Sequence, residues 1–219
     1  MKNNVIVNTG KNKLGNYVYY TRFGQQCARV YLDKIKNPNT EKQQINRAKL
    51  ALLVAIGHAF LLPIRVGLGK YASTRKMTAS NAFAQINYDD ITGQTPDSVM
   101  LDPSLIQISK GSVPGIVSNA VLNVAQPGTI KITVDNSNYD APFASTSDDV
   151  YAVAFCPDTQ ETAIGVVAKR TNNLAQMMIN VPHSWSGLEA HVYTFVKSEY
   201  QGYEGQTSNT EYVGHAEVN

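Results

Sequence analysis

The chain has 219 residues, of which 43% are hydrophobic and 16% are charged, and its formal net charge is +2. This length suits one large domain or two small ones with a hydrophobic core. The charged fraction lies below the roughly 25% that is usual for a globular domain, which indicates surface that something else covers. Two cysteines that lie far apart in sequence, Cys27 and Cys156, exclude a disulfide framework and are expected to be free thiols.

The small net charge hides an uneven distribution along the chain. Residues 1–77 contain 14 basic and 2 acidic residues, a charge of +12, whereas residues 78–219 contain 5 basic and 15 acidic residues, a charge of −10. This asymmetry predicts either a polyanionic partner or complementary contact between copies of the chain.

The first predicted element is a β-hairpin. Two short runs rich in Val, Tyr and Arg, residues 17–22 and 27–32, flank a turn that contains Gly24. Arg22 and Arg29 are expected to lie on this hairpin.

A helix is predicted to begin at Glu41, capped by Asn39 or Thr40. Its later part belongs to an apolar run of 13 residues, 50–62, which Pro63 ends. A membrane span needs about 20 residues, so we expect a buried helix. A helix that is apolar on all sides must be covered by the rest of the chain or by another subunit. The predicted assembly surface consists of Leu50, Leu53, Ile56 and Phe60.

Beyond this helix, a short second helix is predicted near residues 81–87, with Thr78 or Ser80 as its cap. A polar linker follows, and seven strand-like runs then fill the rest of the chain: residues 116–125, 129–135, 150–156, 163–169, 174–181, 189–197 and 210–215. Seven short strands over about 100 residues are typical of an immunoglobulin-like or fibronectin-type sandwich. We therefore predict an α+β chain, with a basic hairpin-and-helix module at 1–101 and an acidic β-sandwich at 102–219.

The pattern GNYVYY, followed by an arginine and then by NPNTEKQQINRAKL, resembles a family of roughly 200-residue proteins of unknown function from Bacteroidota and their phages. The residues that carry this resemblance are Gly15, Asn16, Tyr19, Tyr20, Arg29, Asn37, Pro38, Thr40, Gln43 and Arg47. The resemblance implies a fold and an association with small virion or mobile-element structural proteins, and it implies no activity.

Motifs of catalysis or metal binding are not found in the sequence. None of the four histidines is spaced as a metal ligand beside a cysteine or another histidine. The loop before Asn16 lacks the Lys and Ser/Thr that a phosphate-binding loop needs. Four aspartates, Asp135, Asp140, Asp148 and Asp149, are spaced too irregularly for a calcium loop, although a weak Ca²⁺ site among them stays open. We expect no enzyme, no cofactor, no metal site and no small-molecule substrate.

Basic residues interleaved with tyrosines suit either an acidic protein surface or nucleic acid. The predicted basic face consists of Arg22, Arg29, Arg47, Lys49, Arg75 and Lys76. The favoured hypothesis is a structural assembly protein that contacts copies of itself or other particle proteins. The alternative is a nucleic-acid-binding accessory protein, and the sandwich alone would suggest a surface adhesin. No signal peptide is recognised after Met1, so we expect synthesis in the cytoplasm, with a virion as a later location, and no membrane contact.

Overall fold

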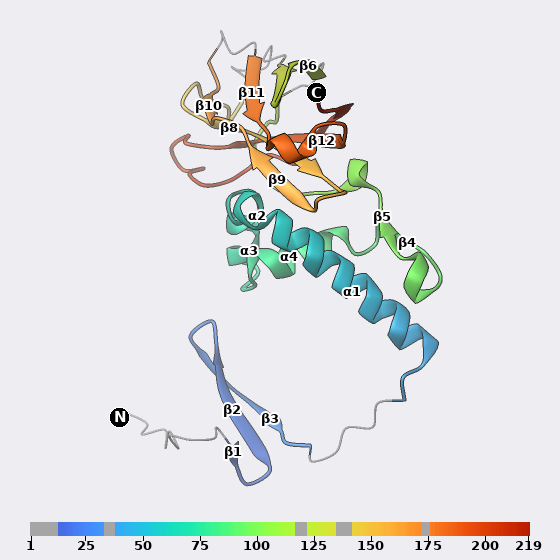
Figure 1. Ribbon diagram of the computed structural model, residues 1–219. Coiled ribbons are helices and arrows are strands. Elements are labelled where there is room, and N and C mark those ends of the chain that lie inside the picture. The colour runs from blue at the N-terminus through green and yellow to red at the C-terminus, as the bar shows by residue number, and fades with distance from the viewer. Residues whose placement is uncertain (1–12, 33–37, 117–121, 135–141, 172–175) are drawn as a thin grey trace. The chain divides into compact units, whose positions relative to one another are not determined.

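A computed structural model describes residues 13–32, 38–116, 122–134, 142–171 and 176–219 of the chain (Figure 1). The chain divides into two compact units, Met1–Thr40 and Glu41–Asn219. Helices and antiparallel strands are both present, so the predicted α+β class is confirmed. Both cysteines are free, as expected.

The first unit contains a small antiparallel sheet in the order β1-β2-β3, built from β1 (Lys13–Leu14), β2 (Tyr17–Arg22) and β3 (Gln25–Val30). This is the predicted hairpin, although its turn has two residues rather than four. Phe23 and Gly24 form the turn with φ angles of 48° and 75°. Positive φ at both central residues matches the right-handed twist of the two strands.

The second unit begins with four helices: α1 (Glu41–Ala59), α2 (Leu61–Gly67), α3 (Gly69–Thr74) and α4 (Ala79–Asn87). Thr78 caps α4, because its hydroxyl accepts a hydrogen bond of 3.2 Å from the backbone N–H of Asn81. This is one of the two caps predicted from the sequence.

A bend of 87° separates α1 from α2. Pro63 explains the bend, because proline has no N–H to donate to the carbonyl four residues earlier and its ring crowds that carbonyl. The carbonyl in question belongs to Ala59, and it accepts a hydrogen bond of 2.7 Å from the Thr162 hydroxyl instead. The helix break therefore provides an attachment point for strand β9 (Glu161–Ile164).

Among the described residues, no single helix is long and apolar enough to cross a membrane; only α1 and α2 taken together, as a bent pair, meet the length and composition requirements.

Two larger sheets follow the helices in this unit. The strands are β6 (Leu122–Gln126), β7 (Thr129–Thr133), β8 (Asp149–Cys156), β9, β10 (Ala168–Lys169), β11 (Gln176–Asn180), β12 (Glu189–Lys197) and β13 (Glu211–Glu217). One sheet has the order β11-β7-β6; the other has the order β10-β8-β12-β13, with β9 also paired to β8. The predicted strand 163–169 is divided at Gly165, where a Cβ atom would lie 2.8 Å from the carbonyl oxygen of Met178. The predicted linker contains a minimal hairpin, β4 (Ile91–Thr92) with β5 (Met100–Leu101).

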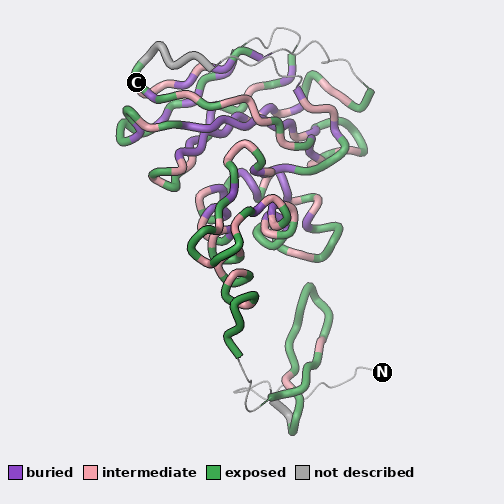
Figure 2. Tube along the Cα trace, turned by 90° about the vertical axis from the view of Figure 1, so that its right-hand side faces the viewer, coloured by how far each residue is buried: buried purple, intermediate pink, exposed green. Residues whose placement is uncertain are grey.

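The second unit has two hydrophobic cores. One lies between the two sheets and includes Ile130, Val192 and the single tryptophan, Trp185. The other lies between the helices and the opposite face of the larger sheet, where the Phe60 ring is 4.8 Å from Phe155 and 5.6 Å from Tyr193, measured between ring centroids. Figure 2 shows buried residues both in the sheets and in the helices that pack on them.

The predicted boundary at 101/102 does not coincide with the observed division at 40/41. The reason is that strands β8 and β12 contribute side chains to the helical core as well as to the core between the sheets. Hydrogen bonds add to this connection. The Asn87 side chain donates to the Gln107 carbonyl at 3.0 Å and accepts from its N–H at 2.7 Å, and the Thr207 hydroxyl donates to the Gly67 carbonyl at 2.8 Å. The helices and sheets thus belong to one compact unit.

Candidate functional site

Three of the four residues predicted for the assembly surface are internal, although the apolar run also has exposed members, Val54 at 58% and Leu62 at 62%. Leu53, Ile56 and Phe60 have exposed fractions of 1%, 8% and 0%, and all three belong to the core between helices and sheet. Of the four predicted residues, Leu50 alone is exposed, at 50%. The sequence left open whether the sheets or another subunit cover this helix, and the structure shows that the chain's own helices and larger sheet together bury these three residues.

The predicted basic face is divided between the two units. Arg22 and Arg29 lie exposed on the hairpin, whereas the other four residues belong to the helical layer. Lys49 donates to the Ile91 carbonyl at 3.2 Å, so this amine is already engaged within the chain. Arg75 also contacts its own unit, because its guanidinium lies 3.8 Å from the centre of the Tyr71 ring. Arg47 and Lys76 are exposed.

The hairpin has two faces of different character. Residues that pair across the strands share a face, and neighbouring residues alternate between faces. The strand register therefore places Tyr17, Tyr19, Ala28 and Val30 on one face and Val18, Tyr20, Arg22, Cys27 and Arg29 on the other. Of the described side chains in residues 15–32, none is buried (Figure 2). The hairpin thus presents an aromatic face and an arginine-bearing face without a core of its own.

Phe23, at the tip of the hairpin, has a sterically unfavourable backbone conformation. Phe23 has a φ of 48°, a region that bulky residues rarely occupy because of steric crowding. Its side chain is 51% exposed, and the Arg22 guanidinium lies 5.7 Å from the ring centre. Strained backbone positions of this kind concentrate at functional surfaces. The tip is accordingly part of the candidate contact surface.

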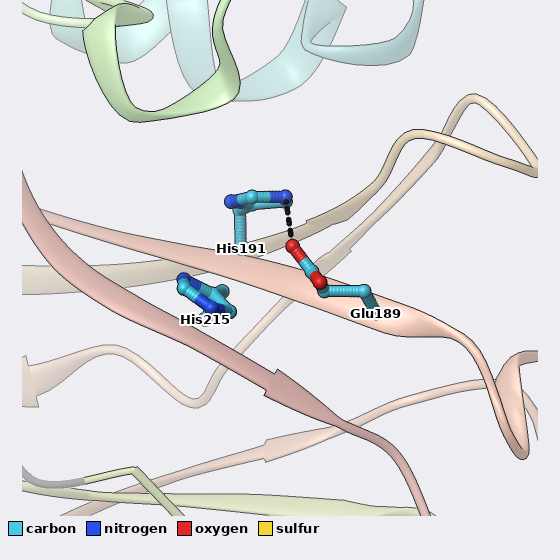
Figure 3. Close-up of side chains that lie close together, drawn as sticks. All are labelled: Glu189, His191 and His215. Carbon is cyan, nitrogen blue, oxygen red and sulfur yellow. Dashed lines mark ion pairs between the residues drawn. The ribbon is translucent and has the colours of Figure 1, made fainter.

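A second cluster, Glu189, His191 and His215, lies on strands β12 and β13 (Figure 3). His191 and His215 are directly opposite each other in the strand register, and Glu189 lies two residues before His191 on the same face. The register shifts between Val192 and Tyr193, so that Tyr212 and His215 also share this face although they are three residues apart. Gly214, at the bulge, has a φ of 142°.

Hydrogen-bonding atoms connect the cluster. The Nε2 atom of His191 lies 3.0 Å from the Oε1 atom of Glu189, and its Nδ1 atom lies 2.9 Å from the Tyr212 hydroxyl. The same hydroxyl lies 3.3 Å from the Nδ1 atom of His215. Burial lowers the pKa of His191, while the Glu189 carboxylate opposes this effect, so the imidazole is mainly neutral near pH 7.

The spacing of residues along the sequence did not predict this cluster. The spacing of His191 and His215 along the chain matches no metal motif, and only cross-strand pairing brings them together. A signal does exist in Gly214, since a glycine inside a strand indicates a bulge that can redirect a neighbouring side chain.

Of the four aspartates considered for Ca²⁺, the two that the structure describes contact basic side chains of the chain itself. Asp148 is buried near Arg170, and Asp149 forms a 2.6 Å ion pair with Lys169. Asp135 and Asp140 lie outside the described residues.

The structure is that of an α+β protein. Its hairpin exposes aromatic side chains and has no core of its own, and its larger unit has two packed sheets, one of which is covered by helices. The chain belongs to a family described as "Family of unknown function (DUF6266)", which matches residues 8–214. This agrees with the expected resemblance to an uncharacterised family over nearly the whole chain. No curated protein and no solved structure matches the chain.

Proposed function

We propose that this protein is a non-catalytic structural protein that assembles with further copies of itself through the hairpin of residues 13–32. The observation that carries the proposal is the exposure of the hairpin's aromatic side chains. Tyr17, Tyr19, Tyr20 and Phe23 are 50%, 44%, 41% and 51% exposed. A small sheet needs a covered hydrophobic face to be stable by itself in water, and none of the described side chains in residues 15–32 is buried. Aromatic side chains dominate the energetics of protein interfaces. A partner surface would stabilise the hairpin by covering these rings.

The charge of the two units favours a second copy as that partner. Residues 1–40 contain seven basic residues and one acidic residue, a charge of +6, and residues 41–219 contain 12 basic and 16 acidic residues, a charge of −4. The hairpin unit of one copy is therefore complementary in sign to the larger unit of another copy. Charge complementarity of this kind speeds encounter and sets orientation more than it adds affinity.

We further infer that the two packed sheets form an immunoglobulin-like or fibronectin-type sandwich. In support, the chain enters the first sheet twice (β6, β7), crosses to the second (β8, β9), returns once (β11) and ends in the second (β12, β13). This alternation resembles the order in which immunoglobulin-like domains fill their two sheets. Combined with the resemblance of the first 50 residues, it favours a structural component of a phage virion or a mobile-element particle.

Nucleic acid is the second candidate partner of the hairpin. The supporting observation is that Arg22 and Arg29 share a face with Tyr20. Cations for phosphates beside an aromatic ring for base stacking are the combination that binds single strands without sequence preference.

Sedimentation of the full-length protein over a range of concentrations tests the assembly proposal. The unmodified chain should form a defined oligomer, and the double variant Tyr17→Ser, Tyr19→Ser should be monomeric with an unchanged unfolding transition of the larger unit. Val54→Ser is the matched control, because Val54 is an apolar helical residue at 58% exposure. A monodisperse monomer of the unmodified chain at high concentration contradicts the proposal.

The salt dependence separates the two partners. Reducing the Debye length to about 3 Å in 1 M salt should weaken the charge-guided contacts between copies and leave the aromatic contacts in place. If nucleic acid is the partner, nuclease-treated protein should be monomeric, and a single-stranded oligonucleotide should bind with an affinity that falls steeply as salt rises. Arg22→Glu with Arg29→Glu should abolish that binding.

A further inference from the structure

We propose that Glu189, His191 and His215 bind a divalent transition-metal ion, with Zn²⁺ as the best-fitting ion. Each residue offers one ligand atom, and these atoms all lie within 4.8 Å of one another (Figure 3). Two imidazole nitrogens and one carboxylate oxygen form a ligand set that proteins use for Zn²⁺, with a fourth position left for water or another ligand. The site lies within residues 41–219 and does not depend on the proposed assembly.

The backbone presents these ligands from two hydrogen-bonded strands. His191 and His215 are a cross-strand pair, and Glu189 precedes His191 by two residues on the same side of β12. The bulge at Gly214 brings Tyr212 to this side as well. Ligands on paired strands are held more precisely than ligands on loops.

Tyr212 orients both imidazoles. Its hydroxyl lies 2.9 Å from Nδ1 of His191 and 3.3 Å from Nδ1 of His215, and its oxygen has two lone pairs to accept a hydrogen from each. In that arrangement both Nε2 atoms are unprotonated. The Nε2 atom of His191 then faces the Glu189 carboxylate at 3.0 Å, and two acceptors at this distance need a cation between them. Partners on the second imidazole nitrogen are a regular feature of metal-binding histidines.

The same atoms also permit an arrangement without a metal. His191 would then donate from Nε2 to Glu189 and accept the Tyr212 hydroxyl at Nδ1. The two arrangements differ in the position of one proton and in the need for a cation, so direct binding measurements distinguish them.

The ligand types select the class of ion. Ca²⁺ and Mg²⁺ prefer oxygen ligands only, whereas imidazole suits Zn²⁺ and its first-row neighbours. A tetrahedral ion with bonds of about 2.1 Å holds its ligand atoms roughly 3.4 Å apart. Glu189 and His215 are exposed, so their side chains can rotate to close the remaining distance around the more buried His191. The bound ion would tie β13, the last strand of its sheet, to β12.

The experiment uses the full-length chain without a histidine tag, stripped of metal with a chelator. Calorimetric titration with ZnCl₂ should give one site per chain, CaCl₂ should give none, and Co²⁺ should produce the visible absorption of a tetrahedral complex. The variants His215→Gln and Glu189→Gln should weaken Zn²⁺ binding at least tenfold, and Tyr212→Phe should weaken it about 10- to 100-fold as the loss of an orienting group. The matched controls are His58→Gln and His183→Gln, since both of these histidines are exposed and lie outside the cluster.

A second measurement separates binding from misfolding. Zn²⁺ that binds the folded state should raise the thermal unfolding midpoint of the unmodified chain and of the two controls, and should leave that of His215→Gln unchanged. The proposal is overturned if the unmodified chain binds no Zn²⁺. It is equally overturned if His215→Gln, with an intact unfolding transition, binds Zn²⁺ as tightly as the controls do.

Discussion

The guanidinium of Arg170 lies 4.0 Å from a carboxylate oxygen of Asp148, and both side chains are fully buried. Arg170 also donates to the carbonyls of Pro114 and Gly115 at 2.7 and 3.0 Å, while Asp148 accepts from the Glu199 N–H at 2.9 Å. These contacts connect four chain segments at one end of β8. Burial lowers the pKa of Arg170, and the Asp148 carboxylate opposes that effect.

Removing one partner of this pair should destabilise the larger unit strongly. Asp148→Ala removes one partner of a buried ion pair, which typically costs about 3–5 kcal/mol in unfolding free energy. The measurement is urea unfolding followed by the fluorescence of Trp185, the only tryptophan. The neighbouring exposed pair serves as control: Lys169→Ala should shift the urea midpoint far less, because solvent screens the contact with Asp149. Equal shifts in the two variants would show that burial does not set the strength of the Asp148 contact.

A second prediction compares two leucines on helix α1. Leu53 is 1% exposed within the core between helices and sheet, and Leu50 is 50% exposed. Leu53→Ala should therefore lower the unfolding free energy by about 2–5 kcal/mol, as lost burial and a cavity combine. Leu50→Ala should change it by about 0.5 kcal/mol or less. If Leu53→Ala instead alters only the oligomeric state and leaves the unfolding transition in place, this helix is an interface element after all.

Features that depend on neighbouring residues could be predicted from the sequence. The hairpin, the start of α1 and the Thr78 cap of α4 follow from local spacing and capping chemistry. Alternation of apolar residues also identified most strands of the two sheets.

Features that depend on distant segments could not be predicted. The apolar run 50–62 requires cover, but nothing in its residues specifies whether the cover is a sheet of the same chain or another subunit. Asp148 and Arg170 are 22 positions apart in the chain, and His191 and His215 are 24 positions apart. Each pair comes together only when the strands that carry or adjoin them pair. The charge count over residues 1–77 likewise combined the hairpin with helical residues that belong to the larger unit.

A third prediction concerns the boundary between units. A fragment of residues 41–219 should unfold in one cooperative transition, because it retains both hydrophobic cores. A fragment of residues 102–219 should aggregate or bind a hydrophobic dye, since it exposes Phe155, Tyr193 and Phe195. Calorimetry and dye fluorescence on the two fragments provide the comparison. A soluble, cooperatively folding 102–219 fragment would restore the boundary predicted from the sequence.

The last prediction uses the buried phenol of Tyr193, whose hydroxyl donates a 2.6 Å hydrogen bond to the Pro103 carbonyl. Burial raises the pKa of Tyr193 above the ordinary value of 10.0, with smaller contributions from Tyr212 and Asp102. Because the folded state favours the neutral phenol, its contribution to stability is fully present below about pH 10 and is lost as pH rises above that value. The loss should reach about 1.4 kcal/mol one pH unit above the unfolded-state pKa.

The variant Tyr193→Phe isolates this contribution. It should be less stable than the unmodified chain at pH 8 by about 0.5–2 kcal/mol, because the Pro103 carbonyl loses its donor. Phenylalanine cannot ionise, so the stability difference between the two proteins should shrink as pH rises from 8 to 11. Tyr151 and Tyr212, whose pKa values burial also raises, are present in both proteins and largely cancel in the difference. Urea midpoints at each pH supply the measurement, and a difference that stays constant up to pH 11 would mean that Tyr193 does not resist ionisation in the folded chain.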